Sequence, residues 1–302
     1  MRGRNLITKR GVAFWPVLAA LLLPPGCAVR RTTRLNPSQM PPAALVASPA
    51  DLAARINARS EAIRTMTAVV DLEPTAGSVY SGVIKEYHDV KGFILLQKPS
   101  LIRMQGQAPV VRTEIFDMVS DGKEFRLYIP PKQKFIVGKT SFHRPAKNAL
   151  ENLRPQHIEE ALLVPPIDPA QEKYFMQEEE VGGRRFYVVT VLEPAAGDEL
   201  TLKRRIWFDR SDLEISRLQI YGEGGTYIED VHYSDYQDFQ GVKYPARIEL
   251  TRPVEDYQLT INIQKATFNQ PIAPEKFELQ KPPNAQLVEL AATRKTEDSG
   301  GQ

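Results

Sequence analysis

The sequence predicts a mainly β protein: an incomplete antiparallel β-barrel, made by a strongly curved meander sheet, with an N-terminal and a central helix covering its concave face. Three observations favour this fold. Apolar and polar residues alternate with period two in many short segments, turn residues separate these segments at hairpin spacing, and helical periodicity is confined to two places. Such alternation is typical of antiparallel strands that bury one face.

The alternation is clearest near the carboxyl end of the chain, over 256–264 and 242–250. A third segment places Leu200, Leu202, Ile206 and Phe208 on one face, with Arg204 as the exception. Turn residues such as Asp121-Gly122, Gly182-Gly183, Gly222–Gly225 and Gln240-Gly241 separate the segments. We therefore expect roughly a dozen strands, mostly in up-and-down order.

Two segments are predicted to be helical. Ser48 and Asp51 begin an amphipathic stretch whose apolar stripe includes Leu52, Ile56 and Ile63. Residues 146–164 are predicted to form one or two short helices that end at Pro165-Pro166. A helix inserted midway through a meander must lie across a face of the sheet or plug its mouth.

The N-terminal residues have the pattern of a secretory signal peptide. A basic segment precedes the apolar run 11–23, which is too short to span a membrane and is followed by Gly26 and the single cysteine, Cys27. We expect a signal peptide over 1–26 and a flexible tether over 27–49. A folded domain would follow over 50–290, with a disordered tail over 291–302.

Cys27 directly after Gly26 resembles the lipobox of bacterial lipoproteins. The resemblance implies cleavage before Cys27 and attachment of diacylglycerol to its sulfur, and two or more acyl chains give stable anchoring. Ala28 in place of aspartate points to the periplasmic face of the outer membrane. The alternative is an ordinary secreted protein with a cysteine near its cleavage site.

The composition excludes several classes of function. The 302 residues include 39 Lys+Arg and 37 Asp+Glu, so the net charge of +2 disfavours a nucleic-acid-binding protein. One cysteine and four histidines argue against an internal disulfide and a structural zinc site. No phosphate-binding or nucleophile motif occurs. We therefore expect no catalytic residues, no metal and no cofactor.

Two short helices need not fill a curved sheet, so an apolar cavity for an acyl chain is one expectation and a fully packed core is the other. The residues expected to line the cavity share inward strand positions: Leu202, Ile206, Phe208, Ile248, Leu259, Ile261 and Ile263. Leu162, Leu163 and Val164 are predicted to form either a lid or membrane-contact tip, or an internal helix face.

Two segments resemble the LolA/LolB-like outer-membrane lipoprotein-sorting proteins. Residues 231–250 have that superfamily's hairpin, a strand, a turn with Gly241 and then Tyr244-Pro245 before Ile248. Residues 268–279, followed by Pro282 and Pro283, are similar to its closing segment. The resemblance implies a half-barrel over about 50–290 that takes up acyl chains of lipoproteins or lipids without a covalent step. Cys27 would place the chain among the lipid-anchored receptors.

Two functions follow as alternatives. The first is a non-enzymatic envelope lipoprotein that binds acyl chains in its cavity for transfer to the outer membrane. Its partners would be lipid or lipoprotein chains and the bacterial membrane. The second is an anchored periplasmic sensor or protein-interaction module with the same fold. A hollow interior would favour the first, and a tightly filled interior the second.

Overall fold

The computed structural model describes residues 43–77, 84–86, 90–140, 154–195, 197 and 199–290. The predicted signal peptide, Cys27, most of the tether and the tail lie outside these residues. So does the first half of the helical segment predicted over 146–164. None of the described helices is long and apolar enough to cross a membrane.

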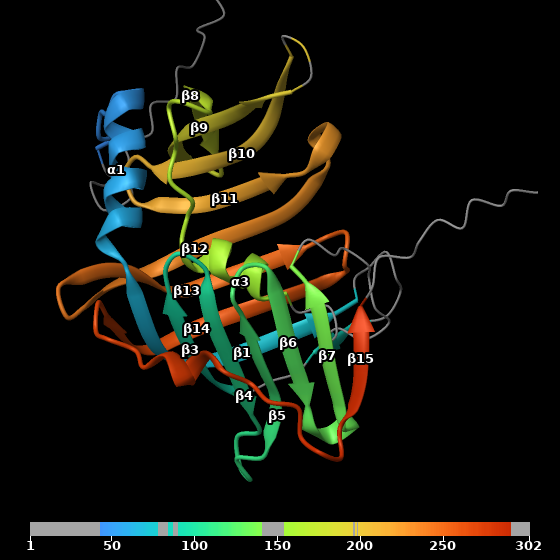
Figure 1. The fold of residues 1–302 in the computed structure, drawn as a ribbon. Coiled ribbons are helices and arrows are strands. Elements are labelled where there is room, and N and C mark those ends of the chain that lie inside the picture. Colours follow the sequence, from blue (N-terminus) through green and yellow to red (C-terminus); the bar gives the residue numbers. More distant parts are fainter. Residues whose placement is uncertain are drawn as a thin grey trace, which may run out of the picture. The chain divides into compact units, whose positions relative to one another are not determined.

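The described residues form two α-helices and one large sheet (Figure 1). The helices are α1 (Pro49–Ala62) and α3 (Pro155–Leu162). The strands of the first half are β1 (Thr65–Ala76), β2 (Lys85–Glu86), β3 (Val90–Gln97), β4 (Leu101–Gln107), β5 (Glu114–Ser120), β6 (Glu124–Ile129) and β7 (Lys134–Lys139). Those of the second half are β8 (Lys173–Val181), β9 (Arg184–Pro194), β10 (Leu200–Asp209), β11 (Ile215–Tyr221), β12 (Tyr227–Phe239), β13 (Val242–Arg252), β14 (Tyr257–Phe268) and β15 (Gln286–Leu290).

The sheet consists of two meanders joined through its first strand. The order is β15-β7-β6-β5-β4-β3-β1-β14-β13-β12-β11-β10-β9-β8, with β2 beside β1. We call β3–β7 the first arm and β8–β14 the second arm. All pairings are antiparallel except that of β15 with β7. Since β8 and β15 are the two ends of this order, the sheet is not closed. The predicted mainly β class is confirmed.

Helix α1 begins where the sequence predicts. Ser48 is its N-cap: the Ser48 hydroxyl accepts from the backbone N–H of Asp51 at 3.2 Å, and the Asp51 carboxylate accepts from the Ser48 N–H at 2.9 Å. This reciprocal pair satisfies two N–H groups that a helix start leaves without partners. Pro49 at the first helical position fits, because its ring fixes a helical φ. Leu52 and Ile56 are buried against the sheet.

Inward side chains of the second arm line up across its strands. Val189, Ile206, Leu218, Val231, Leu250 and Leu259 form one continuous row, each paired with the next through the register of β9 to β14. All six side chains are buried and belong to the main apolar cluster. The period-two pattern therefore places a complete apolar layer on the inner face of this arm.

The contacts of helix α3 with strands that are far apart in the sheet show that the sheet bends. It contacts β4 and β5 of the first arm and β13 of the second, and Figure 1 shows it between the two arms. Strands β5 and β13 are five steps apart in the order, which would separate them by about 24 Å in a flat sheet. A helix about 10–12 Å wide reaches both only if the sheet curves around it.

Gly106 marks a close contact within the first arm. It is paired with Phe116 on β5, and a Cβ atom at Gly106 would lie 2.3 Å from the buried Phe116 ring. We predict that Gly106→Ala lowers the free energy of unfolding by about 1–3 kcal/mol, since the ring must leave its packed position. Gly222→Ala is the control, because its Cβ would meet nothing closer than 3.5 Å at a negative φ. Urea unfolding of both variants measures the difference; equal stabilities would contradict the clash.

Candidate functional site

Most residues predicted to line a cavity lie together in the apolar interior. Ile206, Phe208, Ile248, Leu259, Ile261 and Ile263 are all buried members of one cluster. Ile248 pairs with Ile261 across β13 and β14. Leu202 is the exception, because an irregularity between Leu202 and Arg204 turns Leu202 to the opposite face, where it pairs with half-buried Leu192. The buried inward position belongs instead to Arg204.

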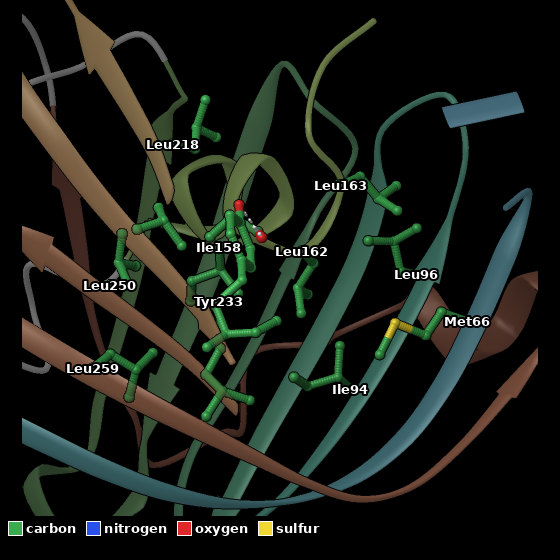
Figure 2. Packing of buried hydrophobic residues seen from close by; sticks show 14 of the residues in the cluster. Met66, Ile94, Leu96, Ile158, Leu162, Leu163, Leu218, Tyr233, Leu250 and Leu259 are labelled. Carbon is green, nitrogen blue, oxygen red and sulfur yellow. Dashed lines mark hydrogen bonds between the residues drawn. The ribbon is translucent and has the colours of Figure 1, made fainter. Parts of the chain in front are cut away.

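The interior between the arms is filled by side chains rather than hollow. Figure 2 shows Ile158 and Leu162 between Leu250 on one side and Ile94 and Leu96 on the other, with Leu163 beside Leu96. Of the two expectations drawn from the sequence, the structure shows a packed core between the described elements. Any ligand that enters this space must displace side chains that now occupy it.

One crevice opens into this core where α1, α3 and the second arm meet. Its lining residues are Arg59, Ser60, Ile63, Leu162, Leu163, Val164, Tyr233, Tyr236, Tyr244 and Pro245. Its free volume is about 20 Å³, which is room for one water molecule. The crevice is thus a narrow gap beside α3, apolar at depth and polar at its rim.

The predicted lid or tip residues form part of this crevice. Leu162 and Leu163 are buried and Val164 is half-buried, so all three face the interior. The three side chains therefore pack inward at the end of α3, with Leu162 as its last residue and Leu163 and Val164 just after it. Helix α3 ends at Leu162, two residues before the predicted end at Val164, and Pro165 and Pro166 follow Val164.

Two buried tyrosines hold the end of α3 against the second arm. The Tyr233 hydroxyl donates to the carbonyl oxygen of Ala161 at 2.9 Å (Figure 2). The Tyr244 hydroxyl donates to the carbonyl oxygen of Leu162 at 2.5 Å. These carbonyls lie in the last turn of α3, where no further helical N–H can reach them. Burial raises the pKa of both phenols, that of Tyr233 far above its ordinary value, so both remain donors. Neither tyrosine was identified from the sequence, since the partners are backbone atoms.

Tyr236, which lines the crevice, has two cations over its ring. The Arg59 guanidinium lies 5.0 Å from the centre of the Tyr236 ring, and the Lys243 ammonium lies 5.8 Å from it. Both cations contact one carboxylate, Glu214, at 3.4 Å and 3.1 Å. A second hollow adjoins the crevice and is lined in part by Arg55, Arg59 and Lys243.

A buried ion-pair cluster bounds the inner face of the second arm at its other end. Arg252, 2% exposed, contacts Glu229, 0% exposed, at 2.9 Å and Glu255 at 2.8 Å. Arg204 forms a bidentate pair with Glu172, both bonds being 2.8 Å long. Burial raises the pKa of Glu229 to about 8. Glu229, Val231 and Tyr233 are two residues apart on β12, so the alternation of side chains along the strand places Glu229 on the same buried face as the other two.

Helix α3 brings two glutamates into partly or largely desolvated positions. The pKa of Glu159 is raised to about 7, mainly by burial and also by the neighbouring Glu160, while Lys98 opposes the shift. Burial also raises the pKa of Glu160. In the described part of the chain, no group of three or more His, Cys, Asp and Glu side chains is arranged to hold a metal ion.

The fold is similar to that of a solved DUF1329 family protein from Desulfovibrio piger, with a TM-score of 0.50 and 14% identity over 76% of this chain and 95% of that one. At this identity the match shows a shared fold alone. Two more structures are similar: a LolA superfamily protein from Nitrosomonas europaea and a putative outer membrane lipoprotein-sorting protein domain from Vibrio parahaemolyticus. Their TM-scores are 0.48 and 0.46, each at 12% identity over 75% of this chain and over 97% and 94% of theirs.

Sequence comparisons add little to the structural ones. A family model described as "-like: Uncharacterized protein" matches residues 169–281, which is less than half of the chain. No curated protein sequence matches this chain. The candidate site therefore rests on its own geometry.

The raised pKa of Glu159 predicts a pH-dependent stability. The folded protein keeps a proton that the unfolded chain loses above its ordinary pKa of 4.5, so stability falls as pH rises from about 4.5 to 7. The free energy of unfolding should fall less between pH 5 and pH 8 in Glu159→Gln than in the unsubstituted protein, by about 1 kcal/mol. The difference is smaller than the full pKa shift would give, because the carboxyl is partly exposed to water. Urea midpoints at the two pH values measure it. Glu61→Gln, at an exposed position of α1, is the control, and an unchanged fall in the Glu159 variant would refute the assignment.

Proposed function

We propose that this protein binds an acyl chain of a lipid or lipoprotein in the apolar interior that α3 now occupies, and that it does so without catalysis. The observation that carries the proposal is the position of α3. Its apolar residues Ile158, Ala161 and Leu162 fill the space between two arms of one bent sheet. The resemblance of 231–250 and 268–279 to the lipoprotein-sorting superfamily supports the same ligand class.

Binding requires an exchange, because the closed interior has no room for a chain. An acyl chain gains roughly 0.8 kcal/mol for each methylene that it buries, so about a dozen methylenes supply on the order of 10 kcal/mol. Displacement of α3 breaks its apolar contacts with the sheet and the two hydrogen bonds from Tyr233 and Tyr244 to its last carbonyl oxygens. Helix α3 is only eight residues long, so its apolar surface is similar in scale to that of the chain that would replace it.

The arrangement in which α3 fills the interior, which we call the closed state, carries a desolvation cost that displacement of α3 would remove. Glu159 and Glu160 are held where burial raises their pKa values, and both carboxyls would regain water if α3 moved aside. The apparent affinity for an acyl chain then depends on the fraction of molecules in which α3 is displaced. Exchange needs only this difference in free energy, with no nucleotide and no covalent step.

We further propose that Cys27 carries the membrane anchor, with the folded domain on the periplasmic side of the outer membrane. Support comes from the lipobox-like sequence and from Ala28 after the cysteine. Cys27→Ser should yield protein that leaves the membrane fraction without detergent, because the acyl chains that anchor it are lost. Fractionation followed by immunoblotting measures this, and continued membrane association of the variant would disprove anchoring by Cys27.

By the criterion drawn from the sequence, the filled interior favours the second candidate, an anchored sensor or protein-interaction module, and acyl binding requires in addition that α3 moves aside. A domain whose interior never opens would use its surface and the open edges of β8 and β15 instead. The two candidates differ in one measurable property, which is whether the folded protein takes up an acyl chain.

Uptake of a fluorescent fatty acid by the full chain carrying Cys27→Ser tests acyl binding. We predict saturable uptake, and about fivefold tighter apparent binding when Tyr244→Phe removes the bond to Leu162, because loss of about 1 kcal/mol from the closed state raises the open fraction. Tyr221→Phe is the matched control, since it removes a hydroxyl that donates to Gln219 away from α3. No uptake by folded protein, with either tyrosine variant, would reject acyl binding and leave the interaction module.

A further inference from the structure

Where the crevice meets the adjoining hollow, at Arg59, the described lining residues include more cations than anions. Arg59 and Lys243 share the carboxylate of Glu214, so two cations face one anion. Arg55 adds a third cation at the adjoining hollow, where Glu214 is again the one acidic lining residue described. An anion placed here would therefore meet an excess of positive charge.

Arg59 is held with its guanidinium presented at the rim. Its Nη2 donates to the carbonyl oxygen of Lys243 at 3.1 Å, and its Nη1 donates to the Tyr236 hydroxyl at 3.3 Å. The guanidinium lies over the Tyr236 ring, whose hydroxyl donates to the carbonyl oxygen of Ile215 at 2.8 Å. A planar cation fixed in this way suits a carboxylate or phosphate group, which accepts bidentate bonds.

A third side of the rim is formed by the end of α1. Ser60 lines the crevice, and its hydroxyl accepts from the Lys98 ammonium at 2.9 Å. Burial lowers the pKa of Lys98, while the nearby Glu159 and Glu61 raise it. The cation behind Ser60 is accompanied by two glutamates, so the positive excess at the opening comes from Arg55, Arg59 and Lys243.

The rest of the crevice lining is largely apolar. Ile63, Leu162 and Leu163 line it together with Arg59. A purely polar ion would make no contact with these apolar residues, and a neutral hydrocarbon would make no ionic contact with the cations. The arrangement is complementary to a molecule with an anionic head and an apolar tail.

We infer that the opening where the crevice meets the adjoining hollow is the headgroup subsite of the proposed acyl site, and that its ligands are single amphiphiles with a carboxylate or phosphate head. Arg59 and Lys243 bind the anionic head, and the tail enters beside Leu162 as α3 moves aside. This inference rests on the proposed function and specifies its ligand class.

Binding of two ligands of equal chain length tests the subsite: a monoalkyl phosphate and the corresponding primary alcohol. Isothermal titration of the full chain carrying Cys27→Ser should show about tenfold tighter binding of the phosphate, since charge-assisted bonds stabilise its head. In Arg59→Gln and in Lys243→Gln the preference should fall to about threefold or less, with the affinity for the alcohol unchanged. Arg247→Gln, which removes an arginine paired with Glu249 elsewhere on β13, is the control and should keep the full preference.

The outcomes separate this inference from the proposed function. Equal affinity of the unsubstituted protein for phosphate and alcohol ligands would overturn the headgroup subsite and leave acyl binding intact. Binding of neither ligand would reject acyl binding itself. Inorganic phosphate that binds the rim as tightly as the alkyl phosphate would overturn the amphiphile assignment, because the apolar tail would then add nothing.

Discussion

The packing of helix α3 between the two arms of one sheet is the contact on which the structure depends. A sheet of this width that buries one face needs other elements to cover that face, and α1 and α3 supply the cover. Because α3 contacts strands five steps apart, it also fixes the curvature of the sheet. The inner rows of β9–β14 and the apolar residues of the first arm then share a single core rather than two.

The same contact explains why a packed interior and an acyl-binding role are compatible. Helix α3 contributes apolar side chains to the core but is fastened at its end by two phenol-to-carbonyl hydrogen bonds. Apolar contacts are non-directional, so a hydrocarbon chain can replace those of α3 at similar free energy. The bonds of Tyr233 and Tyr244 are directional and specific to the closed arrangement. In the proposed exchange, the balance between this arrangement and one with α3 displaced is therefore set by a few polar groups.

Local patterns in the sequence predicted the elements well, whereas the pairing of distant strands was not predictable from them. Alternation over 242–250 and 256–264 located β13 and β14, and Ser48 located the start of α1. Nothing in that alternation indicates that β1 pairs with β14, or that β15 lies parallel to β7, because period two reports burial and not the neighbouring strand. Leu202 was misplaced because one bulge residue reverses the faces of a strand. The tyrosine bonds to α3 have no sequence pattern of their own, and neither does the crevice that they border.

The two ends of the second arm's inner face differ in a way that limits where hydrocarbon can lie. Tyr244 at the crevice and Arg252 at the ion-pair cluster are both on β13, eight residues and about 27 Å apart along an extended strand. Between them Ala246, Ile248 and Leu250 point inward and are buried. The cluster is costly to disturb, because removal of one partner leaves a buried charge without its counterion. The rim is partly hydrated and therefore less costly to rearrange, since the Lys243 side chain is 52% exposed. An apolar tail is thus expected to enter from the crevice, and Arg252 and Glu229 close the far end of the apolar layer.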